Sequence, residues 1–230
     1  MATVYAANSG YAYRYTSGGW ASIRDGTTGT NYNDDPSTGA YLNAVGVFHT
    51  SGRGGDTYGV WRSFYYFDTS GITGTLTEAT LKIYGKSNSA ADVIVVKSDA
   101  YGGDGGTALV ADDFNNLDFS TAYSAELATW STSGYNDLAL NSTALADIKN
   151  NDAFIVCLIE HDHDYSDTAP SSADLKNGAY YDNHSGTSKD PYIDYTVSTG
   201  YGNAVLGVAS ANIGKITAVA TADIEKVIGV

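Results

Sequence analysis

The chain has 230 residues, which suits one large domain or one domain with an appendage. Its 26 Gly and 19 Tyr, with few strong helix formers, favour short strands joined by turns. A net charge of −14, with 12 Lys and Arg spread thinly, argues against nucleic-acid binding through phosphate neutralisation. No apolar run approaches transmembrane length, so we expect no membrane insertion.

The N-terminal third is rich in Gly, Tyr, Thr and Asn. Tyr11, Tyr13 and Tyr15 alternate with smaller residues, as on one face of a strand. Residues 20–26 are interpreted as a short strand that leads into a turn, and residues 41–50 as another strand.

The middle of the chain carries the strongest strand patterns. Residues 59–68 are aromatic-rich, residues 78–85 alternate polar with apolar side chains, and residues 92–98 form a third run. The acidic stretch 112–120 is interpreted as a loop, and residues 123–130 as a strand.

One helix is expected, over residues 142–149, with Asn141 or Ser142 as its N-cap. A continuous apolar strand follows over residues 152–160, and it contains Cys157, the single cysteine, as a small buried side chain. With further strands over residues 135–140, 178–181 and 192–197, about ten strands and one helix are expected.

This pattern predicts an all-β fold, specifically an antiparallel jelly-roll β-sandwich with one short helix over residues 1–198. Alternating βαβ units are absent from the pattern, which argues against a parallel α/β fold. Residues 199–230 differ in composition and are interpreted as a short repetitive C-terminal tail.

The tail repeats itself at an offset of eleven residues, because residues 208–216 are echoed by residues 219–227. Each repeat is either a helical turn followed by an extended step or part of a right-handed supercoil. Neither form buries its own apolar side chains, so we expect the tail to assemble or anchor the protein, and docking on its own domain is the alternative. The expected assembly residues are Val205, Val208, Ile213, Ile216, Val219, Ile224, Val227 and Val230.

A family resemblance rests on three segments: residues 62–72, residues 79–84 and the closing residues 186–195. With them, the chain resembles the DNRLRE-type β-sandwich domains over roughly residues 55–198, although the signature that names the family is not intact. These are jelly-roll modules similar to carbohydrate-binding modules, found in bacterial surface proteins and phage structural proteins. The tail resembles short repeats of phage virion proteins.

The resemblance implies a non-enzymatic display protein on a virion surface, such as a fibre, decoration or tail-associated adhesin. The N-terminus shows no signal-peptide pattern, which fits a virion protein released by lysis. The expected partners are further copies or a larger virion assembly, reached through the tail, and a glycan. The alternative is the carbohydrate-binding module of a secreted or cell-surface protein.

Aromatic side chains are the candidate ligand contacts, in particular Trp20, Tyr13 and Tyr15. Such residues also build sandwich cores, and that alternative stays open, above all for the Trp residues.

Metal binding is considered at two kinds of site. Residues 161–164, His-Asp-His-Asp, offer metal-ligand side chains, but an extended chain would place both His on one side and both Asp on the other. A polar loop is the alternative interpretation. The resembled modules often carry structural calcium, which makes the acidic loops candidates for it, although none has an EF-hand spacing. No other cofactor is expected.

Catalysis finds little support in the sequence. The carboxylates considered as glycosidase pairs are Asp68 with Glu78 and Glu126 with Glu160, and pairs of that kind are defined by spatial separation. A small glycan-active enzyme is the third hypothesis, after the display protein and the carbohydrate-binding module.

Overall fold

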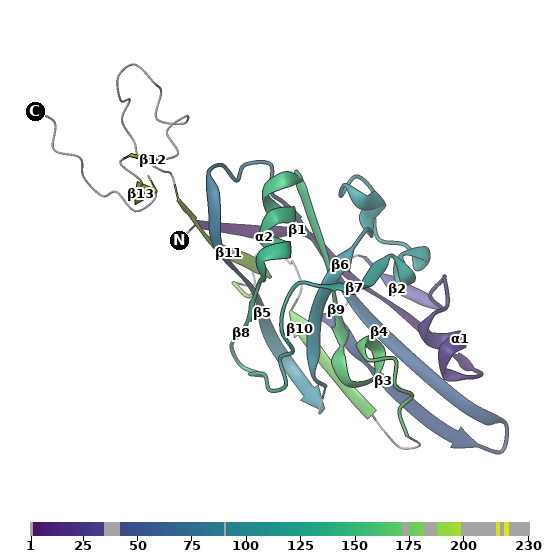
Figure 1. Ribbon diagram of the computed structural model, residues 1–230. Helices are drawn as coiled ribbons and strands as arrows, with labels where there is room; N and C mark the ends of the chain where they lie inside the picture. The colour runs from purple at the N-terminus through teal and green to yellow at the C-terminus, as the bar shows by residue number, and fades with distance from the viewer. Residues whose placement is uncertain are drawn as a thin grey trace, which may run out of the picture.

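A computed structural model of the chain describes residues 2–34, 42–89, 91–171, 175–181 and 188–198, with the short segments 215–216 and 219–220 (Figure 1). The strands are β1 Ala2–Ser17, β2 Asn31–Asn33, β3 Leu42–Gly52, β4 Gly55–Asp68, β5 Thr75–Ser89, β6 Val93–Ser98, β7 Leu117–Ala122, β8 Tyr135–Ala139, β9 Ala153–Glu160, β10 Leu175–Tyr181, β11 Tyr192–Ser198, β12 Lys215–Ile216 and β13 Val219–Ala220. The helices are α1 Trp20–Arg24 and α2 Ser142–Asn150, with 3₁₀ turns at Tyr101–Gly103 and Ala111–Asn115 and a π-helical turn at His161–Tyr165.

Strands β1 to β11 form one large antiparallel sheet in the order β2-β1-β11-β5-β10-β3-β4-β9-β6-β7, with β8 added beside β5. The long strand β1 pairs with β11 at its start and with β4 along most of its length, so the sheet curls back on itself. The prediction of an all-β, antiparallel fold is confirmed. The jelly-roll arrangement of the connections stays a prediction.

Strand β9 and the adjoining half of β4 are buried on both faces. Along β9, Phe154, Val156 and Leu158 enter one core cluster, together with side chains of β5 and β11. The alternate residues Ile155 and Cys157 enter a second cluster on the other face. Burial on both faces explains why this strand is continuously apolar, as the sequence indicated.

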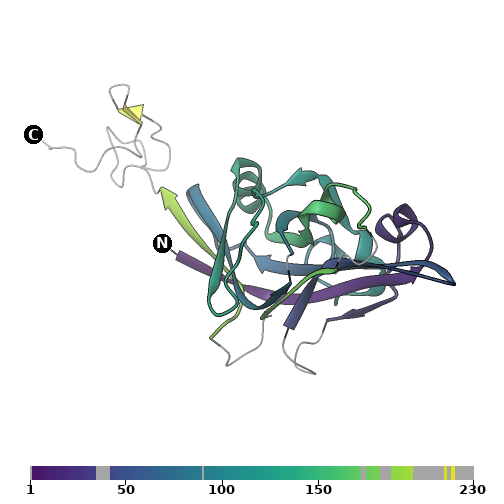
Figure 2. The ribbon, with the colours of Figure 1, turned by 90° about the horizontal axis from the view of Figure 1, so that it is seen from below.

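The second core cluster is covered by short helical segments rather than by another sheet. Ile23 of α1 and Phe114 of a 3₁₀ turn pack there against Val60 and Phe64 of β4. Figure 2 shows α1 and α2 at different ends of the sheet. They also pack on opposite faces of β4 and β9, because Ile23 of α1 belongs to the second cluster, whereas Ala144 and Ile148 of α2 belong to the first. The candidate site lies on the same face of β4 as the first cluster, because Trp61 alternates with Val60 and shares the face of Tyr65 and Phe67.

Helix α2 and its N-cap confirm the predicted helix, because the side chain of Asn141 accepts hydrogen bonds from the backbone N–H groups of Thr143 and Ala144, both at 3.1 Å. The strand predicted over residues 20–26 is wrong, since Trp20–Arg24 is helix α1. Trp20 and Ile23 stand three residues apart, which is helical spacing, and Ile23 is fully buried.

Two further segments differ from the predictions. The stretch interpreted as a loop over residues 112–120 contains β7, which pairs with β6. The strand predicted over residues 123–130 is irregular chain that makes only isolated bridges, from Ser124 to Leu140 and from Leu127 to Val93.

The tail lies mostly outside the described residues. Lys215 and Ile216 pair with Ala220 and Val219 as two antiparallel two-residue strands. No helix among the described residues is long and apolar enough to cross a membrane.

Candidate functional site

Five aromatic side chains on strands β1, β4 and β3 form a chain of ring contacts that starts and ends on β1. We call this group the aromatic row: Tyr11, Tyr13, Trp61, Phe48 and Tyr15. Ring centroids are 6.3 Å apart from Tyr11 to Tyr13 and 5.7 Å from Tyr13 to Trp61. They are 5.3 Å apart from Trp61 to Phe48 and 5.2 Å from Phe48 to Tyr15. Every ring in the row therefore contacts at least one other ring of the row.

The register of the strands places these rings on one face. Tyr13 of β1 lies opposite Trp61 of β4, and Phe48 of β3 lies opposite Gly59 of β4. Side chains alternate along a strand, so Tyr13 points away from its buried neighbour Ala12, which packs in the cluster beneath α1. The row therefore lies on the face of the sheet opposite to α1, which is also the face of the first core cluster.

Gly59 makes room for the row at its centre. A Cβ atom at this position would lie 2.0 Å from Cε1 of Phe48, so the Phe48 ring lies directly over the glycine. Any side chain at position 59 would displace the ring that links Trp61 to Tyr15.

The row is open to solvent and has polar neighbours. Tyr15 is 49% exposed, and the other rings of the row are half-buried. Asn31 and Asn33 of β2 lie opposite Tyr13 and Tyr11 and share their face. Aromatic faces beside amide groups can stack on apolar C–H surfaces and exchange hydrogen bonds with hydroxyl groups.

The structure separates the three predicted contact residues. Tyr13 and Tyr15 belong to the row, but Trp20 does not, because it lies on α1 on the other side of the sheet. The Nε1 of Trp20 donates to Oδ1 of Asp167 at 3.1 Å, and its ring packs edge-on against Tyr58. Trp130 is a core residue, as the alternative interpretation of the Trp residues held, and it packs against Tyr180.

Phe48 and Trp61 are not among the predicted contact residues. Trp61 is one of the Trp residues that could equally build a sandwich core, and Phe48 lies inside the strand predicted over residues 41–50. Only the cross-strand register shows that both meet Tyr13 and Tyr15.

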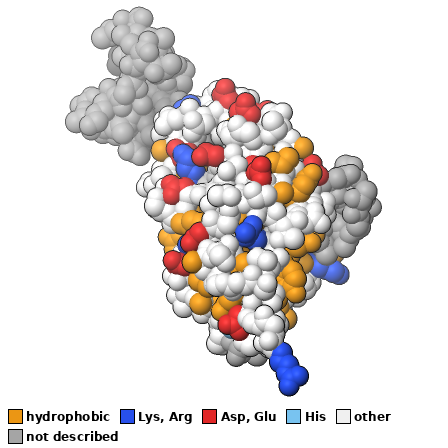
Figure 3. Space-filling view, turned by 90° about the vertical axis from the view of Figure 1, so that its right-hand side faces the viewer, with side chains coloured by type: hydrophobic (Ala, Val, Ile, Leu, Met, Phe, Trp, Pro, Cys, Tyr) orange, Lys and Arg blue, Asp and Glu red, His pale blue; other side chains and the backbone are white. Residues whose placement is uncertain are grey.

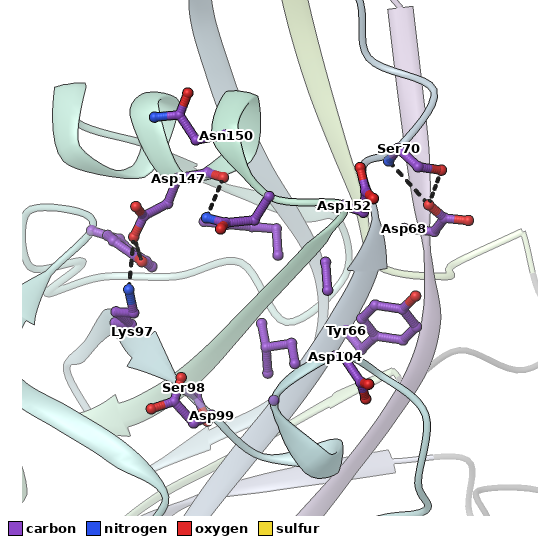
Figure 4. A pocket seen from close by; sticks show the side chains of 16 residues that line it. Tyr66, Asp68, Ser70, Lys97, Ser98, Asp99, Asp104, Asp147, Asn150 and Asp152 are labelled. Atoms are coloured by element: carbon purple, nitrogen blue, oxygen red, sulfur yellow. Dashed lines mark hydrogen bonds and ion pairs between the residues drawn. The ribbon is translucent and has the colours of Figure 1, made fainter.

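A hollow of about 530 Å³ lies apart from the aromatic row, where β4, β6 and β9 meet the end of α2 (Figure 4). Asp68 and Ser70 lie on one side of it, and Lys97 and Asp147 form an ion pair of 3.2 Å on the other. The hydroxyl of Ser70 donates to Asp68 at 2.6 Å and lowers the pKa of that carboxyl, which is then ionised at neutral pH.

Tyr66 completes this hollow. Burial, followed by the charges of Asp68 and Asp104, raises the pKa of its phenol. The raised pKa of Tyr66 and the lowered pKa of Asp68 both lie away from neutral pH, so these two groups suit hydrogen bonding better than proton transfer at neutral pH.

The two members of each carboxylate pair named for glycosidase chemistry have different surroundings. Asp68 lines the hollow of Figure 4, whereas Glu78 lines a separate depression with Lys82 and Asp194. Glu160 is fully buried and accepts backbone hydrogen bonds from residues 162–164, while Glu126 is exposed.

The segment His161–Asp164 is not extended, so the alternation predicted for an extended chain is wrong. It forms a π-helical turn capped by the side chain of Glu160. Asp164 pairs with Arg62, and Nδ1 of His163 lies 2.8 Å from the carbonyl oxygen of Thr168. His161 and Asp162 instead approach Glu126.

Of the eight predicted assembly residues, only Ile216 and Val219 fall in the described segments, where they pair with each other. The other six lie outside the described residues: Val205, Val208, Ile213, Ile224, Val227 and Val230.

On the face shown in Figure 3, acidic side chains are scattered and the basic ones stand apart from one another. This distribution offers no stripe of basic residues that could follow a phosphate backbone on that face.

A scan against protein-family models and a search of the curated proteins found no match to this chain.

Proposed function

We propose that the chain is a non-enzymatic surface-display protein that binds carbohydrate chains through the aromatic row. The observation that carries the proposal is the set of five contacting rings, all partly open to solvent, on the sheet face opposite to α1. Open rings of this kind lose hydration when a ligand covers them, which is a favourable term in binding.

The chemistry of the row suits a saccharide. One face of a pyranose ring presents C–H groups, which pack on aromatic faces, while its rim presents hydroxyl groups. Asn31 and Asn33, beside the row, offer amide donors and acceptors for such hydroxyls. Because the five rings spread over three neighbouring strands, they offer more surface than one sugar ring covers, which suits an extended glycan rather than one terminal sugar.

The display role and the tail belong to the same proposal. The last described strand of the large sheet, β11, ends at Ser198, before the repeat begins. In the proposal, the sandwich displays the aromatic row and the tail assembles or anchors copies. A virion surface is the setting we favour, on the resemblance of the sandwich and tail to phage proteins. The carbohydrate-binding module of a secreted protein is the second setting, and the aromatic row would serve both.

A glycan array with the full chain tests the binding role. Saturable binding to an extended glycan is expected, and Tyr13→Ala and Tyr15→Ala are each expected to weaken it about fivefold, since one lost stacking ring costs on the order of 1 kcal/mol. Tyr32→Ala is the matched control, because Tyr32 is also exposed but its strand partner Ala12 faces the other side of the sheet. Equal binding by all four proteins, or no glycan bound at all, would contradict the role of the row.

Comparison of the full chain with a chain ending at Thr199 tests the tail. Light scattering should show a larger assembly for the full chain and a monomer for the shortened one. If both are monomeric and incorporate equally into particles, the assembly role of the tail is wrong.

A further inference from the structure

Three chain segments meet at the beginning of strand β6. Val93, the first residue of β6, pairs with Glu160 at the end of β9 and bridges to Leu127. The N–H of Leu127 donates to the carbonyl oxygen of Val93 at 2.8 Å, and the N–H of His161 donates to that of Asp92 at 2.8 Å. These bonds fix the backbone on which Glu126 and His161 stand.

The side chains at this junction offer three potential metal ligands. Nδ1 of His161 lies 3.5 Å from Oε2 of Glu126 and 3.4 Å from Oδ1 of Asp162. One ligand atom from each residue can be chosen so that all three lie within 4.8 Å of one another. A metal ion held at about 2.0–2.2 Å from nitrogen and oxygen ligands needs atoms about this close, and the exposed Glu126 can supply the remaining adjustment.

Neighbouring groups hold two of these ligands in place. The ring of His161 stacks on Tyr165 with centroids 5.7 Å apart. The ammonium of Lys176 pairs with Oδ2 of Asp162, which leaves Oδ1 directed toward His161. Support of this kind from groups behind the ligands orients them in metal sites.

The turn itself is also constrained. The buried carboxylate of Glu160 accepts hydrogen bonds from the N–H groups of Asp162, His163 and Asp164 at 3.2, 2.7 and 3.3 Å. The backbone that carries His161 and Asp162 is therefore set by contacts that do not involve the ligand atoms.

We propose that Glu126, His161 and Asp162 bind a divalent first-row transition-metal ion, and specifically Zn²⁺. An imidazole nitrogen with two carboxylates suits zinc, whereas calcium and magnesium prefer oxygen ligands alone. Three protein ligands leave a further position on the ion for water or for an oxygen of a bound molecule.

This site is independent of the aromatic row, with which it shares no residue. Loss of metal binding and loss of glycan binding can therefore be observed separately. The sequence pointed to two of the three ligands in its His-Asp-His-Asp segment, and the third, Glu126, comes from 35 residues earlier in the chain.

Calorimetric titration of the full chain, prepared without an affinity tag, tests the proposal. One Zn²⁺ per chain is expected, and Co²⁺ should give the visible absorption of an ion with nitrogen and oxygen ligands. Glu126→Gln and His161→Gln should each weaken Zn²⁺ binding about tenfold or more. Glu78→Gln is the matched control, since it removes an exposed carboxylate on β5 and should leave the affinity unchanged.

Several results would overturn the site. These are an absence of Zn²⁺ binding, equal affinities for wild type and both ligand variants, or tighter binding of Ca²⁺ than of Zn²⁺. Because Glu126 is exposed, its variant should fold normally, so thermal unfolding of the metal-free proteins separates lost binding from lost structure.

Discussion

Arg62 and Asp164 form a two-pronged ion pair in which both side chains are completely buried. Nε of Arg62 donates to Oδ2 of Asp164 at 2.8 Å, and Nη2 donates to Oδ1 at 2.7 Å. The guanidinium also donates to the carbonyl oxygens of Phe114 and Arg24, each at 2.8 Å, and lies over the Phe114 ring. One side chain of β4 thus ties together α1, a 3₁₀ turn and the π-helical turn after β9.

We predict that Asp164→Asn destabilises the fold by about 3–5 kcal/mol, because it leaves a buried guanidinium without its counter-charge. Urea unfolding followed by circular dichroism measures this free energy. Asp137→Asn is the control, since Asp137 pairs with Lys82 at the surface, where its side chain is 59% exposed, and it should cost less than about 1 kcal/mol. Similar losses of unfolding free energy in both variants would show that burial does not determine how much the Arg62–Asp164 pair contributes to stability.

Local patterns were enough to predict several elements. The apolar run of β9 could be recognised because both of its faces are buried, and α2 because Asn141 stands where an N-cap is needed before a helical sequence. In both cases, the information lies within a few neighbouring residues.

Relationships between distant residues could not be predicted in this way. Arg62 and Asp164 are 102 positions apart, and nothing near either residue indicates the other. Helix α1 was mistaken for a strand because it is only five residues long and Gly19 provides no side-chain cap. Its helical form depends on burying Ile23 against β4, which is a tertiary effect.

The aromatic row could be predicted in part from a local pattern, and in part it depends on residues far apart in the sequence. The alternation of Tyr11, Tyr13 and Tyr15 indicated one face of a strand, which β1 confirms. The contribution of Trp61 and Phe48 depends on strand register, which a single sequence does not specify here.

A pH prediction concerns Tyr135 of β8. Burial, followed by the neighbouring Tyr192 and Asp190, raises the pKa of its phenol from 10.0 to about 12. The protonated hydroxyl is within hydrogen-bond distance of the carbonyl oxygens of Ser188 and Asp190, at 3.3 and 3.2 Å. Because the folded pKa lies above the unfolded one, this stabilisation is complete below pH 10 and is lost as the pH rises through about 12.

Comparison of wild type with Tyr135→Phe measures this contribution. Wild type should be more stable by about 1 kcal/mol below pH 10, allowing for solvent screening of a partly exposed group, and the difference should shrink toward pH 12. Tyr15→Phe is the control for the loss of one exposed phenol. If the stability difference between wild type and Tyr135→Phe grew with pH, the pKa of Tyr135 would not be raised in the folded protein.

The final prediction concerns Gly59 at the centre of the aromatic row. In Gly59→Ala, the new methyl group would overlap the Phe48 ring, so that ring must turn away from Trp61 and Tyr15. We expect a loss of about 1–3 kcal/mol in unfolding free energy, a change in tryptophan fluorescence, and weaker glycan binding. Gly54→Ala is the matched control, because a Cβ there meets no atom within 4 Å. If Gly59→Ala bound glycan as well as Gly54→Ala did, the continuity of the row through Phe48 would not matter for recognition, and binding would have to depend on Tyr11, Tyr13 and Trp61 alone.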